Sequence, residues 1–173
     1  MNLKRLLIVL AAVAALGASI AALSFSTNAT VNEEPATMTG MTYGSPDLKS
    51  ANTLAFGPDG VLFVGDSQSG AVFAIDVKDT AKDASAAPVE IKEIDKKIAS
   101  MLGTTPDQIA INDLATHAAS QNIYLAVTRG RGAGSAPALL RVTKNGAIEE
   151  VKLSNVLFSK VALANLPSHE EKT

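Results

Sequence analysis

Residues 52–76 read NTLAFGPDGVLFVGDSQSGAVFAID, and this stretch decides how the rest of the chain is interpreted. Three short apolar runs, at residues 52–56, 61–65 and 71–76, are separated by turns at GPDG and DSQSG. Gly and Pro mark these turns because they free or fix the φ angle where the chain reverses. The run VLFV at residues 61–64 is apolar on both sides, which predicts a strand covered from above and below.

The same pattern returns about 60 residues later. Its members are residues 111–116 (INDLAT), 123–128 (IYLAVT) and 138–142 (ALLRV), which match the three runs in order. A fourth strand is expected after each set, at residues 88–94 (PVEIKEI) and 147–153 (AIEEVKL). Asn145-Gly146 predicts the hairpin turn before the last strand, since this pair accepts positive φ angles. The sequence therefore predicts an all-β fold of two four-stranded antiparallel meanders.

Tandem four-stranded units build β-propellers. Residues 55–76 resemble blades of secreted propellers of the NHL, gluconolactonase-like and quinoprotein-like groups. The matching features are the turn Pro58-Asp59-Gly60, the LFV core, Asp66-Ser67 and the turn at Gly70. Residues 111–127 resemble the next blade of such a protein. The resemblance covers about residues 51–153 and implies a partial β-propeller of two antiparallel blades.

Propellers typically close with 4–8 blades, so two blades do not complete a ring. The resemblance therefore implies either the N-terminal part of a longer protein or copies that associate to complete a ring. The chain is expected to begin with a signal peptide or membrane anchor at residues 1–23 and a linker at residues 24–50, which includes a candidate closing strand at 37–43. The first blade follows at residues 51–94, a helical insertion at 95–110 and the second blade at 111–153. Residues 154–173 are expected to form an incomplete C-terminal segment.

The helical insertion carries its own start and stop signals. Asp95 is expected to be the helix N-cap, and Gly103 is expected to end the helix. Thr105-Pro106 predicts a second helical start, with Pro at the first helical position.

The N-terminus predicts export. Lys4 and Arg5 precede the apolar run LLIVLAAVAALGASIAAL at residues 6–23, and small residues follow, which is the layout of a secretory signal peptide. The run of about 18 residues is also at the lower limit for crossing a bilayer, so an uncleaved anchor is the alternative. We expect a secreted or periplasmic protein, or a membrane-anchored one that faces outside.

The composition and charge of the chain limit the classes of partner that it is expected to bind. The formal net charge is -2, and it becomes more negative without Lys4 and Arg5, so a nucleic-acid partner is not expected. Cysteine is absent, which excludes disulfides and thiolate metal sites. The expected partner is a protein, a glycan or a small-molecule ligand.

The resemblance also implies where a ligand would bind. In propeller blades, the loops between the second and third strands and those leading into the first strand lie on one face, where ligand groups collect. The residues predicted to line this face are Asp66, Ser67, Asn112, Asp113, Arg129 and Arg131.

Each charged group on this face has two interpretations. Asp66 and Asp113, assisted by Asn112 or Asn52, would supply oxygen ligands to Ca²⁺; alternatively, Asp66 caps its own turn. Arg129 and Arg131 would bind a carboxylate or phosphate; alternatively, they lie on a solvated hairpin tip.

No catalytic residue is assigned from the sequence. His117 and His169 are expected to be solvated, and His117 lies in a turn on the face opposite the predicted one. The expected function is an exported binding scaffold. The alternative is part of a lactonase-like or quinoprotein-like propeller enzyme, for which the resemblance implies a divalent metal or quinone cofactor and catalytic residues mostly in other blades.

Overall fold

The computed structural model describes residues 40–82 and 89–164. Contacts along the chain separate Met1–Pro35 from Ala36–Thr173, and every described residue belongs to the second unit. The predicted signal peptide or anchor and His169 lie outside the described residues. Within the described part of the chain, no helix has the length and apolar character needed to cross a membrane.

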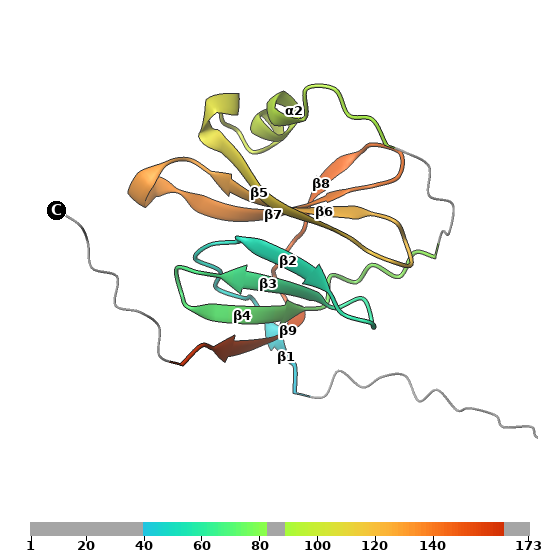
Figure 1. Cartoon of the computed structure of the whole chain (residues 1–173), viewed down its shortest axis with the longest axis vertical. Coiled ribbons are helices and arrows are strands. Elements are labelled where there is room, and N and C mark those ends of the chain that lie inside the picture. The colour runs from blue at the N-terminus through green and yellow to red at the C-terminus, as the bar shows by residue number, and fades with distance from the viewer. Residues whose placement is uncertain (1–39, 83–88, 165–173) are drawn as a thin grey trace, which may run out of the picture. The chain divides into compact units, whose positions relative to one another are not determined.

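Nine strands in these residues form two antiparallel sheets (Figure 1). Sheet A has the order β1-β9-β4-β3-β2, and its strands are β1 (Thr42–Gly44), β2 (Thr53–Phe56), β3 (Leu62–Asp66), β4 (Ala71–Ile75) and β9 (Val156–Ala162). Sheet B has the order β5-β6-β7-β8, and its strands are β5 (Ile109–Thr116), β6 (Ile123–Arg129), β7 (Ala136–Val142) and β8 (Ile148–Glu150). The prediction of a mostly β fold with two antiparallel sheets is confirmed.

The prediction of a fourth strand at residues 88–94, at the end of the first blade, is wrong. Residues 89–93 are not in a strand, and Ile94 begins helix α2 (Ile94–Met101). Val89, Ile91 and Ile94 pack instead against the outer face of sheet B, which buries their apolar side chains without a strand. The place beside β4 is taken by β9, whose register runs from Ala162 opposite Ala71 to Phe158 opposite Ile75. The C-terminal segment therefore completes the first sheet.

The candidate closing strand at residues 37–43 overlaps β1 at Thr42 and Tyr43, but β1 joins the sheet of the first predicted blade and not that of the second. β1 pairs with β9 as the fifth strand of sheet A, with Thr42 opposite Phe158 and Gly44 opposite Val156. Residues 37–39 of the prediction lie outside the described part.

Helix α2 confirms the helical insertion but not its predicted cap. The helix is preceded by Glu93, which has a φ angle of 53°, and Asp95 lies in the first turn. A negative side chain in that turn interacts favourably with the helix dipole. Gly103, at φ 67°, follows the helix as expected, and Pro106–Gln108 form the second helical start as a short 3₁₀ turn.

In the turn before β8, only Gly146 has a positive φ angle, so Asn145 does not use the conformation expected of it.

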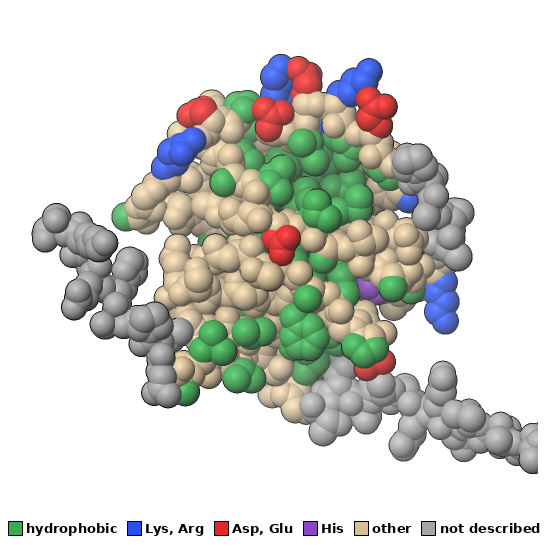
Figure 2. Space-filling view, in the orientation of Figure 1, with side chains coloured by type: hydrophobic (Ala, Val, Ile, Leu, Met, Phe, Trp, Pro, Cys, Tyr) green, Lys and Arg blue, Asp and Glu red, His purple; other side chains and the backbone are tan. Residues whose placement is uncertain are grey.

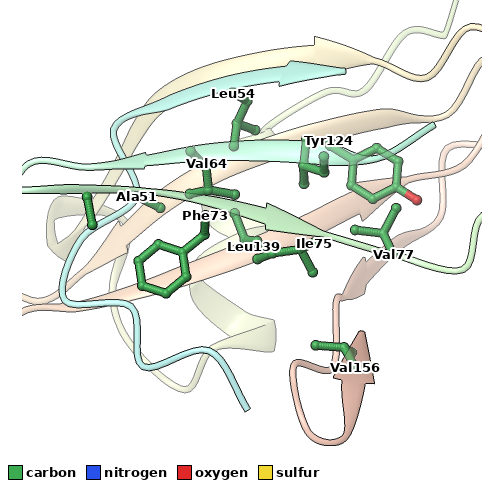
Figure 3. Close-up of a cluster of buried hydrophobic side chains, with 12 residues drawn as sticks. Ala51, Leu54, Val64, Phe73, Ile75, Val77, Tyr124, Leu139 and Val156 are labelled. Atoms are coloured by element: carbon green, nitrogen blue, oxygen red, sulfur yellow. The ribbon is translucent and has the colours of Figure 1, made fainter. Parts of the chain in front are cut away.

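The core lies between the two sheets. Alternate residues of β4 (Ala71, Phe73 and Ile75) are buried there with Tyr124 and Leu139 from sheet B (Figure 3). A second cluster on the outer face of sheet B joins its strands to Ile98 and Leu102 at the end of helix α2. Sheet B is therefore covered on both faces, whereas sheet A is packed against sheet B on one face only.

Candidate functional site

The face of sheet A that points away from sheet B carries exposed apolar side chains. Because side chains alternate along a strand, residues between the core positions point to this side. Two rows of paired residues form its central part, Thr53, Gly65, Val72 and Val161 in one and Ala55, Phe63, Ala74 and Ser159 in the other. We call these eight residues the open face. Phe63 is 41% exposed and Val161 is 64% exposed, and Figure 2 shows hydrophobic side chains gathered over the strands of sheet A.

A hollow of about 190 Å³ interrupts the open face at Gly65. Its lining includes Thr53, Val72 and Leu163, together with the polar residues Asn52, Asp66 and Ser67. Two residues predicted to bind a ligand, Asp66 and Ser67, thus border an apolar hollow at one end of the open face.

The Asp66 carboxylate is fully occupied by donors from its own chain. It accepts hydrogen bonds from the backbone of Lys49 (2.7 Å), from the backbone and hydroxyl of Ser50 (3.0 and 2.7 Å) and from the backbone of Ser69 (3.0 Å). Burial acts to raise the pKa of Asp66, but these hydrogen bonds outweigh it and lower the pKa to about 2. This geometry matches the turn-capping interpretation, and Asp66 ties the entry to β2 onto the turn after β3.

Asn112 and Asp113 lie where β2 of sheet A meets β5 of sheet B. The register of β5 shifts between Ile111 and Asp113, a bulge that turns these side chains toward β2. The Asn112 amide donates to the carbonyl of Ala51 (2.7 Å), and the Asp113 carboxylate accepts from the backbone of Leu54 (2.8 Å). Both predicted ligand residues therefore join the two sheets.

The side chains of Arg129 and Arg131 contact the segment between α2 and β5. The Arg129 guanidinium donates to the carbonyl of Leu102 (3.2 Å), and Nε of Arg131 donates to the carbonyl of Asp107 (3.0 Å). These bonds fasten the segment between α2 and β5 to the end of β6. The six predicted residues thus fall into three places: the hollow, the junction of the sheets and the helical segment.

His117 is not solvated, and that prediction is wrong. It is 5% exposed and makes an edge contact with the ring of Phe56 at 5.0 Å. Its Nδ1 accepts from the backbone of Ser120 (3.2 Å) and lies 3.7 Å from the carboxylate of Asp79. The turn HAASQN holds a buried polar group, which its small and polar residues did not reveal.

Asp79 is the centre of this buried group. Its carboxylate accepts hydrogen bonds from Ser120 (2.7 Å), Asn122 (2.9 Å) and Tyr124 (2.9 Å). Burial acts to raise the pKa of Asp79, but the three donors and nearby His117 lower it overall. Burial and the adjacent Asp79 raise the pKa of the Tyr124 hydroxyl. Asp79 lies in a charged loop, and its partners are more than 40 residues away in the sequence, so no local pattern predicts this role.

A second cavity, of about 720 Å³, lies between the end of β4 and strands β7 and β8. Its charged lining residues are Asp76, Lys78, Arg141, Glu149, Glu150 and Lys152. Arg141 is paired with Glu149 at 2.6 Å, and the two signs balance, so the lining has no excess charge that would select a charged ligand. Across residues 40–82 and 89–164, no three His, Asp or Glu side chains come together in a way that would hold a metal ion.

The fold and these sites define a mostly β protein of two packed antiparallel sheets and one short helix, with one apolar face exposed. Comparison with known proteins finds no family model, no curated protein and no solved structure that matches the chain.

Proposed function

We propose that the chain is an exported, non-catalytic scaffold of the β-propeller type that binds another protein through the open face. Export rests on the signal-like residues 1–23. The observation that carries the binding role is the open face itself, since the largest apolar patch on a soluble protein is often a functional one.

The packing of the two sheets supports the propeller interpretation. Each sheet begins with a meander of three consecutive strands, and the first strands, β2 and β5, meet through the bond between Leu54 and Asp113. First strands lie innermost in neighbouring propeller blades, so a side-by-side arrangement of β2 and β5 is what that architecture requires. A propeller blade is also covered on both faces, and VLFV at residues 61–64 has the sequence of such a strand.

The proposed partner presents the apolar face of another β-sheet. The inner face of sheet A already packs on a sheet, and the open face continues the same strands with apolar or small side chains. None of its eight residues is charged, so burial leaves no unpaired charge. Burying the exposed parts of Phe63 and Val161 contributes about 1 kcal/mol each.

The test compares binding by the wild-type chain with binding by a Phe63→Asp/Val161→Asp variant. Proteins recovered from the exported fraction of the native host are identified, purified and titrated against each chain by calorimetry. A partner of the open face binds the double variant at least tenfold more weakly, because a carboxylate would be buried without a counter-charge. Leu114→Asp is the matched control, since Leu114 is 59% exposed on β5 of sheet B.

Partners that bind all three chains with equal affinity would contradict the open face as the binding site. Thermal melting of each variant separates this outcome from loss of fold.

A further inference from the structure

We infer that the open face binds a second copy of this chain, in a two-fold symmetric dimer in which Phe63 of each copy covers Gly65 of the other. The inference rests on the proposed function in that both use the open face, but it names the partner. It follows from the order of large and small side chains in the two rows.

Phe63 and Gly65 lie on the same side of β3, two residues apart, which is about 7 Å along a strand. A two-fold axis in the plane of the interface, perpendicular to β3 at Val64, reverses the strand direction of the second copy. Such an axis places Phe63 of one copy over Gly65 of the other, and the reverse contact follows by symmetry.

The same axis pairs the remaining positions of the two rows. Val161 of one copy comes over Ser159 of the other, Val72 comes over Ala74, and Thr53 comes over Ala55. Each pair sets a larger side chain against a smaller one, which is how facing sheets interdigitate at about 10 Å separation. The open face is therefore complementary to itself.

Gly65 leaves the space that this contact needs. The hollow there has a volume of about 190 Å³. A Cβ atom added at Gly65 would meet the Cβ of Thr53 at 3.5 Å, an ordinary contact, so the backbone itself tolerates a side chain. The packing of sheet A therefore does not require glycine at residue 65. The missing side chain instead leaves space in the hollow for a side chain of the second copy.

The size of the face sets the expected strength of the dimer. Four strands about 4.8 Å apart and about 17 Å long give a face of about 300 Å², or roughly 600 Å² over both copies. Stable complexes bury about 1,200 Å² or more, so the dimer is expected to be weak and reversible.

The experiment is sedimentation equilibrium of the full chain over a wide range of concentrations. The weight-average mass of the wild type is expected to rise from that of one chain toward that of two, without larger species. Phe63→Asp is expected to hold the mass at that of one chain, and Leu114→Asp is expected to behave as the wild type does.

Gly65→Val separates the specific contact from general hydrophobic association. This variant adds apolar surface, so non-specific association would increase, whereas filling the hollow is expected to abolish the dimer. An increase in association with Gly65→Val would overturn the inference, as would a Phe63→Asp variant that still dimerises. Gly65→Val also serves where Phe63→Asp fails to fold, because residue 65 tolerates a Cβ atom.

A wild-type chain that stays monomeric at every concentration would also overturn the inference. The proposed function would then still be tested separately, by calorimetric measurement of the binding of a different protein to the open face.

Discussion

The hydroxyl of Tyr124, on β6 of sheet B, donates to the carboxylate of Asp79 at 2.9 Å, and so fastens the segment after β4 of sheet A to the second sheet. Ser120 and Asn122 donate to the same carboxylate oxygen. The Asp79 side chain is 2% exposed, so this group of bonds is shielded from water. A second polar link between the sheets is formed by Asn112 and Asp113 with the chain at β2.

Replacing Asp79 is expected to destabilise the fold strongly. Asp79→Ala leaves the donors of Ser120, Asn122 and Tyr124 without their acceptor in a buried place, which costs about 2–4 kcal/mol of unfolding free energy. Tyr124→Phe removes one donor and is expected to cost about 1 kcal/mol. Urea unfolding measures both, and Asp59→Ala, in the exposed turn before β3, is the control. Equal stability of Asp79→Ala and Asp59→Ala would show that the buried group contributes nothing.

Acid is expected to weaken the fold through Asp66. The folded pKa of about 2 is below the ordinary value of 3.8, so the Asp66 carboxylate contributes stability that is fully present above about pH 4. That contribution, about 2 kcal/mol, is lost as the pH falls through the folded pKa. The urea midpoint of the wild type is therefore expected to fall from about pH 4 to pH 2 more steeply than that of Asp66→Asn. Parallel curves for the two proteins would assign the acid sensitivity to other groups.

Gly60→Ala is expected to be more harmful than Gly103→Ala. Both glycines have positive φ angles, 75° and 67°, which cost an alanine about 1 kcal/mol. A Cβ atom at Gly60 would also lie 2.6 Å from Nε2 of buried His117, whereas Gly103 has open space around it. The melting temperatures of the two variants give the comparison. If they drop equally, His117 has room to move aside.

Strand β9 is expected to stabilise sheet A through its inner face. Phe158 stacks on Phe73 with ring centroids 6.4 Å apart, and Phe158→Ala removes this contact at a cost of about 2 kcal/mol. Val161, on the other side of the same strand, is 64% exposed, and Val161→Ala is expected to change stability by less than about 0.5 kcal/mol. Chemical denaturation of dilute protein compares them, and a similar loss in both would mean that β9 contributes mainly through its backbone.

The strands that local signals mark could be predicted from the sequence. Gly60 and Gly70 end the turns that precede the second and third apolar runs, and β2, β3 and β4 were found within a residue or two of their expected bounds. The pairing of β4 with β9 could not be predicted, because it joins residues more than 80 positions apart and depends on which apolar segment buries better against Phe73.

In the candidate site, too, features set by local sequence could be predicted, and features set by distant contacts could not. The turn-capping interpretation of Asp66 follows from its place after a strand, and the geometry matches it. The burial of His117 and Asp79 depends on two loops from different sheets meeting, which no local pattern reports. The two-sided run VLFV predicted a strand covered on both faces, but sheet B covers only one face of sheet A, and Phe63 on the other face is 41% exposed.

The position of β9 also determines the order in which the protein is built. On a ribosome, Ile75 emerges 83 residues before its partner Phe158, a delay of roughly 4 to 17 seconds at about 5–20 residues per second. Throughout that interval β4 is an edge strand with unpaired backbone groups, the kind of surface to which another chain adds. A nascent chain halted before Val156 is therefore expected to aggregate more readily than the finished chain, in which β9 pairs with β4.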